Sequence, residues 1–150
     1  MTLALPEPMQ EALALAKTAA ACGEVPVGAV ITRGGAIIAR ASNAMRGGND
    51  PTAHAEIVVI RAAASLLGNQ RLDGCDLWVT LEPCAMCAGA ISHARIARLY
   101  YGAADPKGGA VENGPRFFGQ DSCHHRPEVY SGLGEAPAAA LLREFFASKR

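Results

Sequence analysis

The sequence contains no apolar run long enough to cross a membrane. A spanning helix needs about 18 consecutive apolar residues, and the 150 residues hold no such run. The N-terminal stretch 1–7 also lacks the basic start and the long apolar segment of a secretory signal peptide. We therefore expect a cytoplasmic protein that has no membrane partner.

An excess of charge of one sign is lacking as well. The 14 Lys and Arg residues balance the 14 Asp and Glu residues, so the formal net charge is zero. Proteins that bind nucleic acid over much of their surface are usually basic, and any RNA site here has to be local. Half of the residues are hydrophobic, which excludes general disorder. The length favours a single domain over 1–150.

The cysteines do not make up a set of disulfides. There are five of them, at 22, 75, 84, 87 and 123. An odd number in a cytoplasmic chain argues against a disulfide framework and favours metal binding or burial. We expect Cys22, in an alanine-rich segment, to lie in the core.

The chain shows no internal repeat and no low-complexity tract, so secondary structure is predicted from apolar periodicity and turn residues. Helices are expected over about 9–20, 51–67, 83–93 and 138–148, and strands over 27–31, 36–41, 76–81 and 96–101. Asp50 and Pro51 resemble the cap and first residue of the second helix. Residues 103–135 are expected to be mainly loop. Strands that alternate with helices after a hairpin predict one α/β sheet covered on both faces.

One histidine and two cysteines have the spacing of metal ligands. Cys84 and Cys87 lie three apart near the start of a predicted helix, so their thiols share one face. A helix N-terminus also lowers the pKa of a thiol. With His54, they make a tetrahedral ligand set for one Zn²⁺ per chain that leaves the fourth position open, as in catalytic zinc sites.

Glu56, two residues after His54, is the candidate catalytic proton carrier. Residues two apart on an ideal helix point in nearly opposite directions, so the sequence leaves open how both reach the metal. The pattern H-x-E followed by P-C-x-x-C is nevertheless the signature of zinc-dependent nucleobase deaminases.

Two alternative metal sites remain open at this point. Cys22, Cys75 or Cys123 could complete a structural site of three cysteines and one histidine, but such a site leaves Glu56 unexplained. Cys123, His124 and His125 could form a second cluster. Because adjacent ligands without a distant partner rarely close a site, we favour a structural or surface role for these three residues.

Four stretches of the sequence stand out together. They read EVPVGAV at 24–30, NDPTAHAE at 49–56, TLEPCAMCAGA at 80–90 and YGAADPKGGA at 101–110. With these stretches the chain resembles the bacterial tRNA-specific adenosine deaminase family, within the cytidine deaminase-like superfamily. The second and third stretches are shared with guanine deaminases. The first and fourth distinguish the tRNA-specific adenosine deaminases from the guanine deaminases. The resemblance covers about 9–146, and residues 111–126 depart from the family's pattern.

The resemblance implies a three-layer α/β/α sandwich with a mixed five-stranded sheet, a homodimer, and a tRNA anticodon stem-loop bound across the dimer. It also implies substrate contacts from Asn43, Asp105 and Lys107, and a hydrogen bond to the Glu82 carbonyl. The C-terminal segment 141–150 resembles the family's last helix, although an amphipathic helix that packs both of its phenylalanine rings explains it equally well.

The expected function is hydrolytic deamination of adenosine to inosine at the wobble position of arginine tRNA. The zinc motif does not select the base, so a deaminase of free guanine or cytosine is the first alternative. A zinc-stabilised RNA-binding module without catalysis is the second. Glu56 speaks against that module, because a structural zinc site needs no proton carrier.

Overall fold

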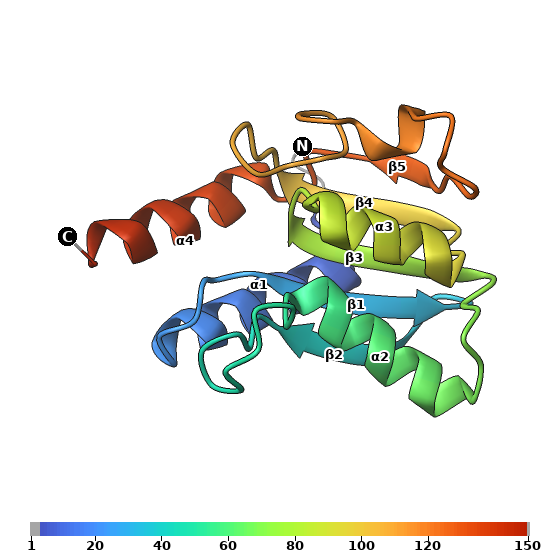
Figure 1. Ribbon diagram of the computed structural model, residues 1–150. Helices are drawn as coiled ribbons and strands as arrows, with labels where there is room; N and C mark the ends of the chain where they lie inside the picture. The colour runs from blue at the N-terminus through green and yellow to red at the C-terminus, as the bar shows by residue number, and fades with distance from the viewer. Residues whose placement is uncertain (1–3, 150) are drawn as a thin grey trace.

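The computed structural model describes residues 4–149, so residues 1–3 of the stretch considered as a signal peptide, and Arg150, lie outside it. Its centre is a five-stranded sheet in the order β2-β1-β3-β4-β5 (Figure 1). The strands are β1 (Gly28–Arg33), β2 (Ala36–Ser42), β3 (Cys75–Leu81), β4 (Arg98–Ala103) and β5 (Glu128–Tyr130). β1 runs antiparallel to β2 and β3, whereas β3, β4 and β5 are parallel. The predicted mixed five-stranded sheet is confirmed.

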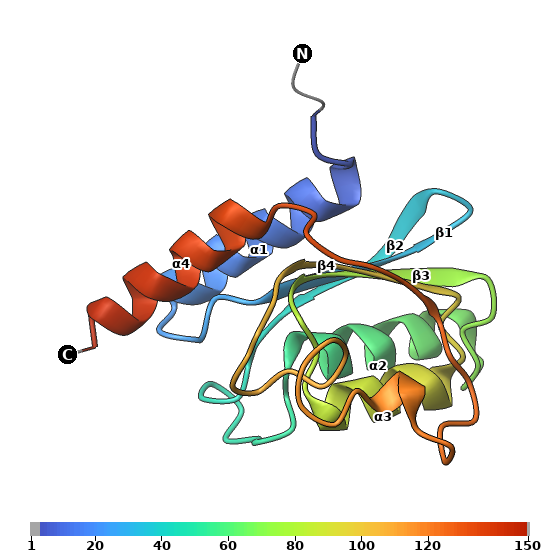
Figure 2. The same ribbon diagram turned by 90° about the horizontal axis from the view of Figure 1, so that it is seen from above.

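In the described part of the chain, four α-helices cover the two faces of the sheet (Figure 2). α1 (Glu7–Ala21) and α4 (Glu135–Ala147) lie on one face, and α2 (Ala55–Leu67) and α3 (Ala85–Ala94) lie on the other. A short 3₁₀ helix, η1 (Phe117–Gly119), packs beside α3. The three-layer α/β/α architecture is thus confirmed. No helix among residues 4–149 is long and apolar enough to span a bilayer.

Each face of the sheet has its own hydrophobic core. The core under α2 and α3 contains Leu77, Ile91 and Leu99, which are fully buried. The core under α1 contains Met9 and Ala12 among its members. The contact between α1 and β1 is so close that a Cβ on Gly28 would lie 2.0 Å from the Ala12 carbonyl oxygen.

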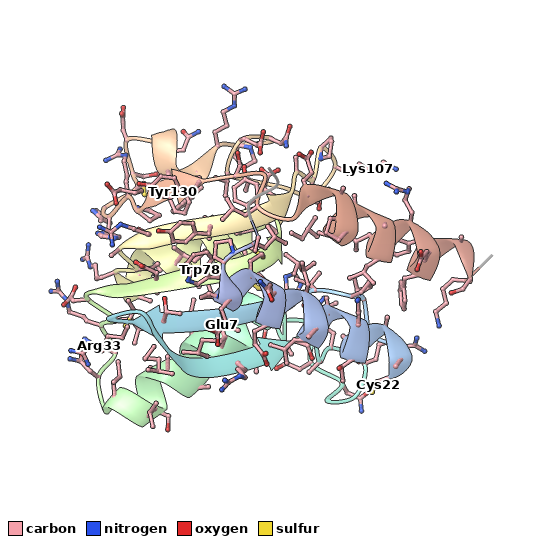
Figure 3. All side chains as sticks on the ribbon, turned by 180° about the vertical axis from the view of Figure 1, so that it is seen from behind. Glu7, Cys22, Arg33, Trp78, Lys107 and Tyr130 are labelled. Atoms are coloured by element: carbon pink, nitrogen blue, oxygen red, sulfur yellow. The ribbon has the colours of Figure 1, made fainter. Side chains whose placement is uncertain are left out.

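Three aromatic rings stack across the parallel strands on the α1 side of the sheet. Trp78 and Tyr100 have ring centroids 3.8 Å apart, and those of Tyr100 and Tyr130 are 5.0 Å apart (Figure 3). Strand β5, which carries Tyr130, lies in the region predicted to be mainly loop. Its three residues are all exposed, so no apolar periodicity marks this strand in the sequence.

The predicted start of the second helix was wrong by four residues. Asp50 accepts hydrogen bonds from the backbone and hydroxyl of Thr52, at 2.8 and 2.7 Å, which close a turn instead of capping a helix. The turn continues with bonds from the Ala53 backbone to the Asp50 carbonyl and from the His54 backbone to the Thr52 carbonyl. His54 itself is extended, and α2 begins at Ala55. The predicted end at Gly68 is confirmed, because this glycine adopts the left-handed conformation (φ 61°).

Candidate metal centre and active site

The fold brings His54, Cys84 and Cys87 together at one end of the sheet. His54 immediately precedes α2, and the two cysteines lie at the start of α3. Their ligand atoms all lie within 4.8 Å of one another. Among residues 4–149 this is the one such group of possible ligands, and Cys22, Cys75 and Cys123 do not join it. The alternative of a four-ligand structural site is therefore wrong.

The distances between these donor atoms fit a zinc ion. His54 Nδ1 lies 3.6 Å from Cys84 Sγ and 3.5 Å from Cys87 Sγ. Zn–N bonds of about 2.0 Å and Zn–S bonds of about 2.3 Å at tetrahedral angles place nitrogen and sulfur ligands about 3.6 Å apart. An imidazole and two thiols are also the donors that zinc prefers. The residues present would hold the metal without rearrangement.

The extended backbone of His54 explains how Glu56 reaches the same place. His54 has φ −66° and ψ 151°, outside the helix, whereas Glu56 lies in the first turn of α2. The opposition expected for residues two apart therefore does not apply, because only one of them is helical. Both side chains line a single cavity of about 240 Å³.

Glu56 is a buried acid that lines this cavity. Only 4% of the surface of Glu56 is exposed. Burial raises the pKa of Glu56 to about 7, since removing a carboxylate from water disfavours its charged form. A carboxyl in this environment is suited to proton transfer.

The two cysteines have unlike environments. Hydrogen bonds from the Cys87 thiol and from His54 lower the pKa of Cys84 to about 4. The pKa of Cys87 is raised, because its thiol donates to Cys84 and is buried. Cys84 immediately precedes the first turn of α3, so the helix N-terminus also favours the thiolate of Cys84.

Asn43 lies at the wall of the cavity. Its side-chain oxygen accepts a 2.7 Å hydrogen bond from the Ala55 backbone N–H. This bond ties the end of β2 to the start of α2 and orients the Asn43 amide. The side chain predicted to contact substrate is thus buried and fixed before substrate arrives.

The cavity continues into a larger groove of about 950 Å³ beside α4. Both spaces are lined by Val25, Leu81, Asp105 and Gly108. The groove adds Lys107, which lies exposed beside α4 (Figure 3). Thus Asp105 lies at the junction of the two spaces, and Lys107 lies only in the groove.

The C-terminal helix does not bury both of its rings. Phe145 is half-buried, but Phe146 is 50% exposed and lines the groove with Leu142 and Arg143. The interpretation of α4 as a helix that packs both phenylalanines is wrong for Phe146. The groove residues of α4 were not assigned from the sequence, because they lie far along the chain from the zinc motif.

Two buried carboxylates hold the loops that border the cavity. Glu24, whose role the sequence did not reveal, accepts 2.8 Å bonds from the backbone N–H groups of Arg46 and Gly47. Glu82 was considered only for its carbonyl, but its carboxylate binds the loop that follows β4. Burial alone raises the pKa of Glu82, yet the hydrogen bonds it accepts from Asp105 and Asn113 lower it overall.

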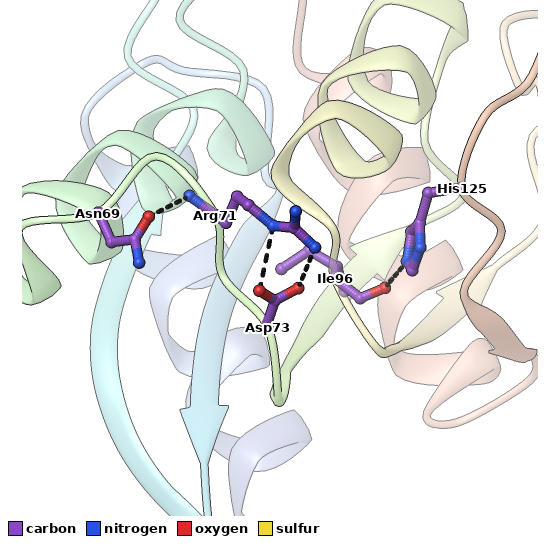
Figure 4. A network of polar contacts seen from close by, with 5 residues as sticks. All are labelled: Asn69, Arg71, Asp73, Ile96 and His125. Atoms are coloured by element: carbon purple, nitrogen blue, oxygen red, sulfur yellow. Dashed lines mark hydrogen bonds and ion pairs between the residues drawn. The ribbon is translucent and has the colours of Figure 1, made fainter.

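Cys123 and His125 pack against the core, whereas His124 between them is exposed. Cys123 is buried beside Ser92, and the His125 ring hydrogen-bonds the Ile96 carbonyl at 2.6 Å, next to the Arg71–Asp73 ion pair (Figure 4). This arrangement supports the structural role. Cys22, by contrast, is exposed at the end of α1, so its predicted burial was wrong.

Comparison with known proteins agrees with this geometry. Residues 5–103 match the model of the cytidine and deoxycytidylate deaminase zinc-binding region. The chain is 61% identical over 142 residues to a tRNA-specific adenosine deaminase of Agrobacterium fabrum. The match covers 95% of this chain and 93% of the relative.

Two solved structures show how the fold is shared. One, from a study of A-to-I editing by tRNA:A34 deaminases, is 61% identical with a TM-score of 0.89, over 90% of this chain and 98% of that chain. A guanine deaminase from Nitrosomonas europaea is 29% identical with a TM-score of 0.77, over 98% of this chain and 87% of that chain. The chain therefore belongs to the cytidine and deoxycytidylate deaminase zinc-binding family, among the tRNA-specific adenosine deaminases.

Proposed function

We propose that this protein deaminates adenosine to inosine at the wobble position of arginine tRNA. The observation that carries the proposal is the likeness, along 95% of the chain, to a tRNA-specific adenosine deaminase. The shape of the site supports it. A cavity of about 240 Å³ is smaller than the usual 300–1,000 Å³ of ligand pockets, and it opens into a groove. One extruded base fits the former, and neighbouring nucleotides fit the latter.

His54, Cys84 and Cys87 would hold one zinc ion per chain. When bound, zinc acts as a Lewis acid that makes water a nucleophile near neutral pH. The reaction consumes one water and releases one ammonia: an oxygen–carbon bond forms at C6 of adenine, and the carbon–nitrogen bond to the amino group breaks.

Glu56 performs the proton transfers of this reaction. Its carboxylate accepts a proton from the attacking water and delivers it to N1 of adenine. It then accepts the remaining proton of the oxygen now bonded to C6 and gives it to the departing amino group, which leaves as ammonia while the C6 carbonyl forms. Asn43 holds the nucleoside, since its amide is oriented at the cavity wall by the bond to Ala55. The Glu82 carbonyl accepts a hydrogen bond from the amine or water.

Asp105 and Lys107 bind the anticodon loop. Lys107 lines the groove, and its ammonium meets a phosphate of the loop in this proposal. The Asp105 Oδ1 atom accepts hydrogen bonds from the backbone N–H groups of Lys107 and Gly108, at 3.2 and 3.0 Å. Its second oxygen suits a ribose 2′-hydroxyl, the group that distinguishes RNA from DNA.

The remaining features of the proposal concern assembly and location. The whole of 1–150 acts as one deaminase domain, and two chains form a homodimer that binds the tRNA anticodon stem-loop. Pooling local basic residues from two chains offsets the lack of net charge. The protein acts in the cytoplasm.

The test is incubation of the purified protein with an arginine tRNA transcript, followed by sequencing that reads inosine as guanosine. We expect conversion at the wobble position alone, and none with a Glu56→Ala variant. A second tRNA given a wobble adenosine tests the choice of tRNA, and equal conversion of both would contradict the restriction to arginine tRNA. Ammonia from free guanine or cytosine, with the wobble adenosine intact, would establish the alternative deaminase instead.

A further inference from the structure

The side chain of Glu82 is engaged by one loop. It is 2% exposed and accepts hydrogen bonds from five N–H donors within residues 105–113. Oε1 accepts from the Asp105 backbone at 2.8 Å and from the Asn113 side chain at 2.7 Å. Oε2 accepts from the backbone N–H groups of Val111, Glu112 and Asn113, at 2.9–3.0 Å.

These bonds hold both ends of the loop. Asp105 lies where the chain leaves β4, and residues 111–113 lie where it turns back towards η1. The Ala110 backbone also donates to the Pro83 carbonyl, at 2.9 Å. The segment between these ties carries Lys107 and Gly108, which line the groove. One buried carboxylate therefore determines the position of the loop at the cavity mouth.

Gly109 permits this arrangement. A Cβ at this position would lie 2.4 Å from Glu82 Cδ and 2.5 Å from the Asp105 carbonyl oxygen. Both distances are far inside van der Waals contact, and one of the atoms belongs to the backbone. Any larger residue at 109 would push the loop away from the carboxylate.

We propose that the Glu82 carboxylate is a positioning residue for the substrate RNA. It holds Asp105 and Lys107 in place before RNA binds, and so it determines affinity for RNA and not the rate of the chemical step. This inference rests on the proposed function. A loop without this anchor would have to be ordered during binding, and the lost conformational entropy of its residues would weaken the complex.

The test compares Glu82→Gln with the wild type on a wobble-adenosine anticodon stem-loop. Glutamine keeps the size of the side chain but turns one acceptor oxygen into a donor, which cannot accept the backbone bonds. We expect KM to rise about tenfold or more, since even a fraction of the loop's ordering entropy suffices for that. The change in KM should exceed any change in kcat, and the zinc content should stay close to that of the wild type, because His54, Cys84 and Cys87 are unchanged.

Gly109→Ala breaks the same contact from the other side, without altering the carboxylate. It should therefore reproduce the rise in KM. Gly119→Ala is the matched control, because a Cβ there has no neighbour within 4 Å, and it should leave KM unchanged. Hydrogen exchange at 105–113 should be faster in the first two variants and unaltered in the control.

Binding of the fluorescently labelled stem-loop separates this inference from the proposed function. If the wild type forms no inosine, the proposed function fails, and the dissociation constants of the variants still test the role of Glu82. Wild-type KM and dissociation constants in both Glu82→Gln and Gly109→Ala would overturn the inference. A fall in kcat at constant KM, or loss of zinc in both variants, would also overturn it.

Discussion

Replacement of Glu56 by glutamine should abolish turnover and yet stabilise the metal-free protein. The two side chains have nearly the same size, so the amide fits the space of the buried carboxyl. An amide cannot carry a proton between water, N1 and the amino group. A single proton transfer contributes about 10²–10⁴ in rate, and Glu56 serves several, so we expect a loss of kcat of about 10⁴ or more.

The burial of Glu56 explains why the glutamine variant should have the higher free energy of unfolding. Burial raises the pKa of Glu56 from its ordinary value of 4.5 to about 7 in the folded chain. Between these values the folded state binds more protons than the unfolded state, so the free energy of unfolding falls as the pH rises. Above pH 7 the folded protein bears the whole free-energy cost of keeping the Glu56 carboxylate charged and buried. At about 1.4 kcal/mol per pKa unit it amounts to about 3 kcal/mol, which the glutamine variant avoids.

Thermal unfolding after removal of metal by a chelator measures this difference. For a chain of this length, about 3 kcal/mol corresponds to a rise in Tm of about 6–12 °C at pH 8. The rise should vanish near pH 4, where the wild-type carboxyl is protonated in both states. Activity near that of the wild type in the folded variant would refute the catalytic role. An unchanged Tm at pH 8 would refute the argument from burial.

Three further outcomes follow from the structure. The wild type should contain about one zinc per chain by elemental analysis, and the double variant Cys84→Ala, Cys87→Ala essentially none; full retention of zinc would exclude this ligand set. Light scattering at micromolar protein should give twice the chain mass of 15.6 kDa, and a strict monomer would contradict the dimer. Gly28→Ala should lower stability to denaturant by about 1–3 kcal/mol or more, because its Cβ would overlap the Ala12 carbonyl. Gly89→Ala, which meets no atom within 4 Å, is its control, and equal stability of the two variants would contradict the close packing of α1.

Elements with strong local signals were predictable from the sequence. Apolar periodicity and glycine stops located α1, the hairpin of β1 and β2, and the end of α2. The start of α2 was not predictable, because Asp50 followed by Pro51 suits both a helix cap and the turn that forms with Thr52. Strand β5 is short and exposed, and it exists because its backbone pairs with β4.

The sequence by itself determined the metal-ligand set and the candidate proton carrier, because both are encoded by residue types at short spacing. Tertiary structure alone decided how they meet. His54 and Cys84 are 30 residues apart, and they converge because α2 and α3 begin at the same end of the sheet. Tertiary structure also gave Glu82 its loop of backbone donors, which lie 23–31 residues along the chain. Nearly all residues have a backbone N–H group, so no side-chain pattern in the sequence predicts which of these groups will donate to a buried carboxylate.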